Sequence, residues 1–217
     1  MTGSVLSPAA RAYLMGRAAT PEVIETWGLV TFDCPLEPCP QENLHKHHGK
    51  YFDRYEGKIV YPLRSPSGRF LGFESRSIDH KDYDQYLLPE SRWNPLWIGM
   101  PYAMGPIWDG EDVIVVEGGF DVFAMLHVAG DRAVVGSGTA HLSWKQTEFL
   151  RRWVRGRVHM AYDRDDAGRK GIADALKTLS SRGVQCSELR YGNAGDDPGS
   201  IWDRGGGAAL RESFPQL

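Results

Sequence analysis

Two stretches of the sequence decide the fold: VIVVEGGFDVFAML (residues 113–126) and RVHMAYDRDDAGRKGIADAL (residues 157–176). Each begins with an apolar run typical of a buried strand and continues into a pattern typical of a helix. The same alternation continues around them, with strands expected at residues 133–136 and 185–191 and a helix at residues 143–154. This order predicts an α/β fold, in which helices cover a parallel sheet.

Acidic residues stand where the two quoted strands end. Glu117 closes the first apolar run, and Asp163 and Asp165 follow the second. Because ligands of open α/β sheets gather beyond the carboxyl ends of the strands, we expect these side chains to converge at one edge. Their mutual repulsion is best relieved by a divalent cation bound through oxygen. The pattern therefore predicts a Mg²⁺ site for phosphate chemistry.

A structural role is the alternative for each of these acidic residues taken singly. One carboxylate after a strand is most often a helix cap or a partner of the helix dipole. Asp121 and Asp166 fit that interpretation. Three carboxylates at two strand ends, with glycines close by, are harder to explain as caps. The set as a whole favours a functional site.

Composition sets the broad class of the protein. The 217 residues are 41% hydrophobic and 24% charged, which is ordinary for a globular protein with a real core. The net charge of −3 excludes the overall basicity that announces a nucleic-acid-binding protein, so any such contact requires a local patch. Three cysteines do not suggest a secreted disulfide framework, and no apolar run suits a signal peptide or a membrane span. A cytoplasmic location is expected.

The first half of the chain has a different organisation. Ser7 with Pro8 and Thr20 with Pro21 predict the starts of two short helices. Residues 58–77 contain two strand-like runs around SPSG and predict a β-hairpin. Residues 81–110 lack periodicity and are interpreted as an ordered connection. We therefore divide the chain near residues 109–112, into an N-terminal subdomain of residues 1–110 and a second domain of residues 111–217.

Two local clusters in the first half deserve separate hypotheses. Residues 45–81 hold a surplus of Lys and Arg that suits a nucleic-acid backbone, although a solvated hairpin face is the alternative. The loop of residues 33–50 contains two thiols and three imidazoles, which suit tetrahedral zinc. Its spacing is permissive, so we favour a plain surface loop and do not expect zinc. The loop side chains are Cys34, Cys39, His45, His47 and His48.

Several segments together resemble a known family. VEGGFDVFAML, VGSGTAHLSWKQTEFLRR and AYDRDDAGRKGIADAL resemble a Toprim domain, and in particular that of bacterial and phage primases of the DnaG type. Upstream, ARAYLMGRAATPEVIETWGLV and the hairpin are similar to the start of the primase core, and downstream GDDPGSIWDRGG is similar to its acidic loop. The resemblance implies a Toprim-type sheet preceded by a smaller mixed α+β subdomain with a basic hairpin. It also implies RNA primer synthesis on single-stranded DNA from nucleoside triphosphates.

The resemblance also implies roles for individual residues. Glu117, Asp163 and Asp165 match the catalytic metal-binding carboxylates, with Asp121 and Asp197 as auxiliary ligands of Mg²⁺ or Mn²⁺. Basic residues that match or flank the family motifs are implied to bind nucleotide or DNA. They are Arg54, Lys58, Arg64, Arg76, Arg169 and Lys170.

Departures from the family pattern keep two rival functions open. Gly199 stands where relatives usually have a second aspartate, Gln85 replaces a common lysine, and WNPLWIG replaces a basic segment. No segment of this sequence resembles the family's zinc-binding module, helical bundle or helicase-binding region, so we expect a phage or mobile-element core served by a helicase or a zinc module in trans. One rival is a Toprim nuclease using a histidine base. The other is a non-catalytic module that binds DNA or a replisome partner. Candidate histidines are His127, His141 and His159.

Overall fold

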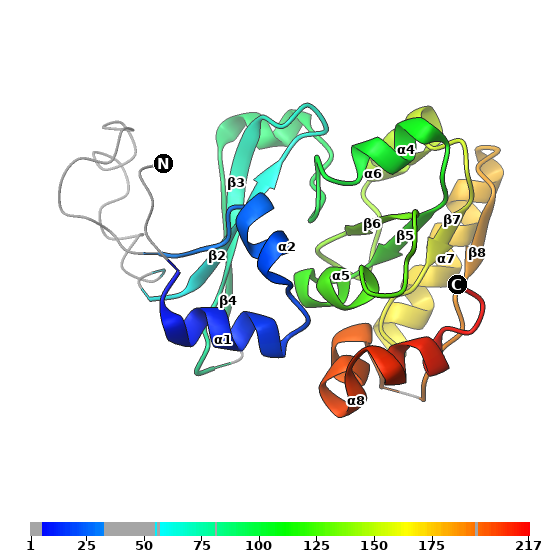
Figure 1. The fold of residues 1–217 in the computed structure, drawn as a ribbon. Coiled ribbons are helices and arrows are strands. Elements are labelled where there is room, and N and C mark those ends of the chain that lie inside the picture. The colour runs from blue at the N-terminus through cyan, green and yellow to red at the C-terminus, as the bar shows by residue number, and fades with distance from the viewer. Residues whose placement is uncertain (1–5, 33–54, 56, 81, 194) are drawn as a thin grey trace.

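Two four-stranded sheets lie side by side in the computed structural model, which describes residues 6–32, 55, 57–80, 82–193 and 195–217 (Figure 1). The first sheet is antiparallel, in the order β1-β2-β3-β4, and the second is parallel, in the order β6-β5-β7-β8. The strands of the first sheet are β1 Val30–Thr31, β2 Ile59–Arg64, β3 Phe70–Arg76 and β4 Tyr83–Leu87. Those of the second are β5 Val113–Val116, β6 Ala133–Gly136, β7 Val158–Met160 and β8 Cys186–Glu188.

The two predicted N-terminal helices are confirmed as α1 (Pro8–Gly16) and α2 (Pro21–Thr26). A side-chain hydroxyl caps the start of each helix. The Ser7 hydroxyl accepts a hydrogen bond from the N–H of Ala10 in α1, and the Thr20 hydroxyl accepts one from the N–H of Val23 in α2, both at 3.1 Å. A proline follows each cap, where its missing N–H costs nothing.

The predicted hairpin is confirmed as the antiparallel pair β2 and β3. The segment of residues 81–110, interpreted as an ordered connection, contains regular elements that the sequence analysis did not predict. They are β4, which pairs with β3, then the 3₁₀ helix η2 (Pro89–Trp93) and the helix α4 (Met104–Asp109). Pairing with a neighbouring strand overrides the weak local pattern, because the ladder supplies β4 with its backbone hydrogen bonds.

The four strands predicted in the second half form the parallel sheet, with β5 between β6 and β7. All four residues of β5 are buried because both faces of the sheet are covered. Ile114 and Val116 pack into one core with the N-terminal helices, whereas Val113 and Val115 pack into a second core on the opposite face. The first core therefore joins the two sheets.

Five helices cover this sheet. Residues of α5 (Gly119–Met125) and α8 (Pro198–Ser213) belong to the first core, and those of α4, α6 (Trp144–Trp153) and α7 (Asp166–Ser181) to the second. The helix predicted at residues 143–154 is α6, and a capping box of Ser143 and Gln146 starts it. Helix α8 was not predicted, because the glycine run at residues 205–207 interrupts its pattern; Gly205 and Gly206 are non-helical. Within the described part of the chain, no helix is long and apolar enough to cross a membrane.

Candidate metal and nucleotide site

Two carboxylates meet at the carboxyl end of the parallel sheet. Glu117 directly follows β5, and Asp163 follows β7 after Ala161 and Tyr162. Glu117 Oε1 accepts a hydrogen bond from the backbone N–H of Asp163 at 3.2 Å. Both side chains are half-buried. The structure thus brings these two together, as the rule for strand ends leads one to expect.

Asp121 adds a third carboxylate from the first turn of α5. Its Oδ2 accepts the N–H of Gly118 at 3.0 Å, and its Oδ1 accepts the N–H of Gly199 at 3.0 Å. The side chain is buried, 8% exposed. Asp121 therefore ties the start of α5 to the start of α8 while pointing into the acidic edge.

Asp197 and Asp165 are the N-caps of α8 and α7. Asp197 Oδ1 accepts the N–H of Ser200 and Asp165 Oδ1 that of Gly168, both at 2.7 Å. Asp165 therefore caps α7, and Asp166 is exposed in the first turn of that helix, where the structural alternative of a helix-dipole partner applies to it. Each of these two bonds uses one carboxylate oxygen and leaves the second oxygen of the group for another ligand.

The carboxylates perturb one another strongly. Burial, together with the neighbouring carboxylates, raises the pKa of Glu117 to about 7 and that of Asp163 to about 7. Burial and the charges of Asp197 and Asp163 also raise the pKa of Asp121. Asp163 Oδ1 is buried without a hydrogen-bond partner. The edge thus concentrates several carboxylates in a partly buried place.

These residues fit a divalent cation by their chemistry. As the side chains stand, no three His, Cys, Asp or Glu residues within the described part of the chain are arranged to hold one ion. The unpartnered oxygen of Asp163 and the raised pKa values nevertheless mark a place where a cation relieves repulsion. An all-carboxylate donor set suits Mg²⁺ or Mn²⁺. Binding then requires rotation of these side chains.

Two glycines allow the acidic edge to be this compact. A Cβ placed on Gly168 lies 2.0 Å from the carbonyl oxygen of Asp163, so only glycine lets α7 begin here. A Cβ on Gly199 lies 3.1 Å from Asp197 Oδ1 and 3.3 Å from Asp121 Oδ1. Gly199, the departure from the family pattern, therefore sits between two carboxylates and contributes a backbone N–H in place of a third.

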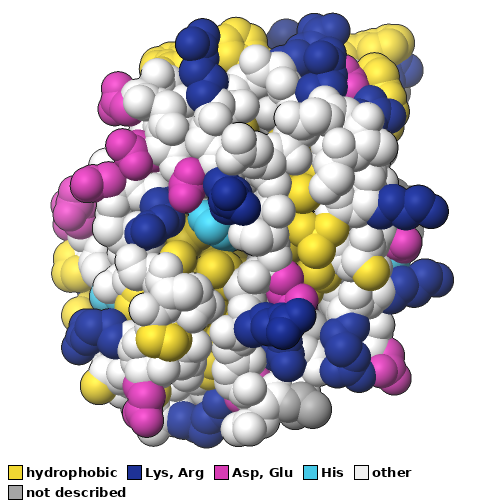
Figure 2. Space-filling view, turned by 90° about the vertical axis from the view of Figure 1, so that its right-hand side faces the viewer, with side chains coloured by type: hydrophobic (Ala, Val, Ile, Leu, Met, Phe, Trp, Pro, Cys, Tyr) yellow, Lys and Arg dark blue, Asp and Glu magenta, His cyan; other side chains and the backbone are white. Residues whose placement is uncertain are grey.

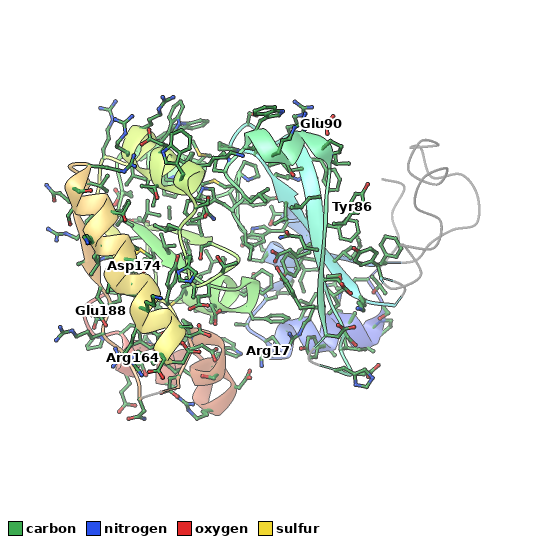
Figure 3. The ribbon with its side chains drawn as sticks, turned by 180° about the vertical axis from the view of Figure 1, so that it is seen from behind. Arg17, Tyr86, Glu90, Arg164, Asp174 and Glu188 are labelled. Carbon is green, nitrogen blue, oxygen red and sulfur yellow. The ribbon has the colours of Figure 1, made fainter. Side chains whose placement is uncertain are left out.

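Two arginines flank the acidic edge, and one was missed by the sequence analysis. The guanidinium of Arg17 lies 4.9 Å from the ring centroid of Phe120, and that of Arg76 lies 5.8 Å from the same ring. Arg17 also pairs with Asp203 of α8. Figure 3 shows Arg17 where the end of α1 meets α8. Arg17 lies in the segment that is similar to the start of the primase core, and this similarity was the sequence feature that could have identified it as a site residue.

The other predicted basic residues have varied surroundings. Lys58 contacts Asp82 at 2.6 Å and Asp84 at 2.9 Å, with its side chain only 11% exposed. Arg64 donates to the carbonyl of Gly68 at 3.1 Å, Arg169 pairs with Asp166, and Lys170 is exposed. On the face shown in Figure 2, Lys and Arg side chains are spread among acidic and uncharged ones. Arg54 and the Cys/His loop lie outside the described residues.

Two of the three candidate histidines make their hydrogen bonds away from the acidic edge. His127 Nε2 lies 2.9 Å from the carbonyl oxygen of Ala18. His159 lies between Asp112, at 3.0 Å from Nε2, and Ser187, at 2.9 Å from Nδ1. His141 is exposed and lines a cavity described below. This placement gives the nuclease alternative no support from His127 or His159.

Comparisons with known proteins agree with this geometry. Residues 114–201 match a Toprim-like domain model. The DNA primase of Aquifex aeolicus is 32% identical over 167 residues, which cover 75% of this chain and 33% of that protein. The crystal structure of the Aquifex aeolicus primase, with its zinc-binding and RNA polymerase domains, matches with a TM-score of 0.69 at 26% identity over 97% of this chain and 56% of that one. The chain belongs to the family of DnaG-type primase cores.

A second solved structure of the DnaG-type family includes DNA. The RNA polymerase domain of Mycobacterium tuberculosis primase DnaG, in complex with a double-stranded DNA oligomer with a 6-nucleotide overhang, matches with a TM-score of 0.63 at 25% identity. The match covers 96% of this chain and 74% of that one. The chain spans about a third of the length of the curated DnaG-type relatives it matches.

Proposed function

We propose that this chain is a primase catalytic core that joins ribonucleotides on a single-stranded DNA template by metal-dependent nucleotidyl transfer. The observation that carries the proposal is the meeting of Glu117 and Asp163 at the carboxyl ends of β5 and β7, with a buried, unpartnered oxygen on Asp163. Kinship with DnaG-type primases, which include an RNA polymerase domain, supports the choice of reaction.

The proposed roles follow from the geometry of the acidic edge. Glu117, Asp163 and Asp165 hold the catalytic Mg²⁺ or Mn²⁺, and Asp121 and Asp197 serve as auxiliary ligands. When bound there, such a cation would supply Lewis-acid activation of the 3′-hydroxyl and charge stabilisation for the leaving pyrophosphate. Because burial and neighbouring carboxylates raise the pKa of Glu117 and of Asp163 to about 7 in the metal-free chain, a binding cation would displace their protons, and its affinity should rise with pH up to neutrality.

Cationic side chains supply the second part of the proposed site. Arg17 and Arg76 flank Phe120 beside the carboxylates, so we assign them to the triphosphate. The remaining predicted nucleotide and DNA contacts keep their assignment as proposals. They are Arg54, Arg64, Arg169 and Lys170. Lys58 is the exception, because Asp82 and Asp84 already pair with its ammonium group.

The division of labour along the chain is part of the same proposal. Residues 1–110 form the subdomain that carries the hairpin, and residues 111–217 the Toprim catalytic domain. Template DNA and nucleoside triphosphate bind between them, and a helicase or a zinc-binding module acts in trans. The DNA-bound solved relative supports the choice of DNA as template.

A primer-synthesis assay tests the proposal. The purified chain is incubated with labelled ribonucleotides, single-stranded DNA of mixed sequence and Mg²⁺ or Mn²⁺, and the products are separated on a denaturing gel. We expect a metal-dependent ladder of short RNA that the Asp163→Ala variant does not produce. Cleavage of the DNA without synthesis supports the nuclease alternative, and DNA binding without turnover supports the non-catalytic module.

A further inference from the structure

A cavity of about 680 Å³ opens between the two sheets, and the primase reaction as proposed does not yet account for it. Its volume is typical of small-molecule sites. The antiparallel sheet contributes Glu74, Tyr83 and Gln85, and the opposite wall is the loop that follows β6 together with the start of α6. The cavity is therefore built from both parts of the chain.

Glu74 is the buried charged group of this cavity, at 1% exposed. Its Oε1 accepts two hydrogen bonds, from the Tyr83 hydroxyl and from Gln85 Nε2 at 2.8 Å. Its Oε2 is buried without a hydrogen bond of ordinary geometry, although the Tyr61 hydroxyl lies near the carboxyl. A buried carboxylate oxygen in this state favours a ligand that brings an N–H donor.

The cavity adjoins the acidic edge directly. The N–H of Gly138, in the cavity wall, donates to the carbonyl oxygen of Glu117 at 2.9 Å. A Cβ placed on the same glycine lies 3.6 Å from Glu74 Oε1. Gly138 therefore separates Glu74 on one side from Glu117 on the other. A nucleotide with its phosphates at the acidic edge has its base within reach of the cavity.

We propose that this cavity binds the base of the nucleoside triphosphate, and that Glu74 Oε2 accepts a hydrogen bond from an exocyclic amino group on that base. The proposal rests on the proposed function, because the carboxylate edge must hold the phosphates. Adenine, cytosine and guanine carry such an amino group, and uracil does not. Trp144, 67% exposed at the cavity wall, supplies an aromatic surface for stacking.

The amino contact is compatible with pairing to a template. An exocyclic amino group has two hydrogens, and a Watson–Crick pair uses one of them. The second hydrogen remains available to Glu74. Glu74 can therefore select among incoming bases while the template also selects among them by base pairing.

The isosteric change Glu74→Gln gives a signature that a structural role does not. Tyr83 and Gln85 both donate toward the Oε1 position, so the new amide oxygen must occupy that position. The amide nitrogen then takes the place of Oε2 and becomes a donor. The preference should turn from an amino-bearing base to one with a carbonyl acceptor, such as uracil.

Calorimetric titration with Mg·ATP and Mg·UTP at about pH 8 tests the proposal, because burial raises the pKa of Glu74 and this pH lies well above the ordinary value of a carboxyl. We expect the unmodified chain to bind ATP about tenfold more tightly than UTP, which is typical of one well-placed base contact. Glu74→Gln should reverse this order. The matched control Glu90→Gln changes an exposed acid outside the cavity and should keep the original order (Figure 3).

A second measurement needs no variant. Purine riboside triphosphate lacks only the 6-amino group of ATP, and the unmodified chain should bind it about tenfold more weakly. Equal affinity for these two nucleotides, or an unchanged order in a folded Glu74→Gln variant, overturns the proposal. The primer ladder on the same preparation separates the two failures. A ladder with no base preference ends only the pocket assignment, whereas the absence of both nucleotide binding and a ladder ends the proposed function as well.

Discussion

Glu117 Oε1 accepts the backbone N–H of Asp163 at 3.2 Å, and this bond joins the ends of two adjacent parallel strands. It fixes two acidic residues side by side in a partly buried place, where burial raises the pKa of both and the charge of Glu117 raises that of Asp163 further. The stability of the chain, its response to metals and its proposed catalysis all depend on this pair.

Asp163→Asn should make the metal-free chain more stable at about pH 8. A carboxyl whose pKa is raised on folding binds its proton more tightly in the folded state, so its ionisation opposes folding. For Asp163 that cost develops as the pH rises from about 4, the ordinary value, to about 7. Thermal unfolding in chelator should show the variant melting several degrees above the parent at about pH 8. The two should melt together near pH 4.

The same series contains its own control. Asp174→Asn replaces an exposed acid on α7, away from the acidic edge in Figure 3, and should leave the melting temperature unchanged at both pH values. A parent chain that is as stable as Asp163→Asn at about pH 8 in chelator would contradict the charge repulsion described for this edge.

Gly168→Ala should destabilise the chain by at least about 2 kcal/mol, because its new methyl group would meet the carbonyl oxygen of Asp163 at 2.0 Å. Gly105→Ala is the matched control, since a Cβ there meets nothing within 4 Å and alanine favours a helix by up to about 1 kcal/mol. Urea unfolding midpoints measure both changes. Equal midpoints for the two variants would show that α7 does not approach Asp163 closely.

Gly199→Asp should lower the melting temperature in chelator and raise the gain in melting temperature on adding Mg²⁺. The new side chain would lie beside Asp197 and Asp121, with Arg17 Nη2 3.3 Å from its Cβ. It adds repulsion from two carboxylates, which one arginine offsets only in part, when no cation is present, and a ligand when one is. Gly199→Asn is the control, with similar size and no charge. If Gly199→Asp and Gly199→Asn gain equally in melting temperature on adding Mg²⁺, residue 199 does not lie at a metal site.

Lys58 should contribute to stability more than to DNA binding. Its ammonium is already paired with Asp82 and Asp84, so Lys58→Met removes a mostly buried charge that its partners have neutralised. Arg64→Met should make the fall of log K for DNA binding with log salt shallower, by about 1 in the size of the slope, as expected for one lost phosphate contact. Lys58→Met should leave that slope unchanged and lower the melting temperature. A shallower salt dependence for Lys58→Met would show instead that Lys58 contacts a DNA phosphate.

Much of the fold follows from local sequence, because the strands of the parallel sheet are apolar on both faces and the helix starts carry caps. Among the elements that the sequence analysis did not predict, β4 and α8 were missed for different reasons. Strand β4 is partly exposed and gains its order from pairing with β3. Helix α8 has a strong start at Asp197 and Pro198, but three successive glycines hide its continuation.

The site was only partly predictable. Strand-end acids could be found because the chain direction fixes where they emerge. The position of Arg17 beside Phe120 depends on how α1 packs against the second half, which no local pattern encodes. The same is true of Glu74, since its burial and its partners on β4 appear only when the antiparallel sheet forms.

The most direct test of the carboxylate edge as a metal site is a Mn²⁺ titration followed by electron paramagnetic resonance, which measures the free ion. At about pH 8 the unmodified chain should remove Mn²⁺ from solution, and Asp163→Asn should bind it at least about tenfold more weakly, since it loses a charged ligand. Equal Mn²⁺ binding by the two proteins would contradict the assignment of Asp163 and Glu117 as the metal centre.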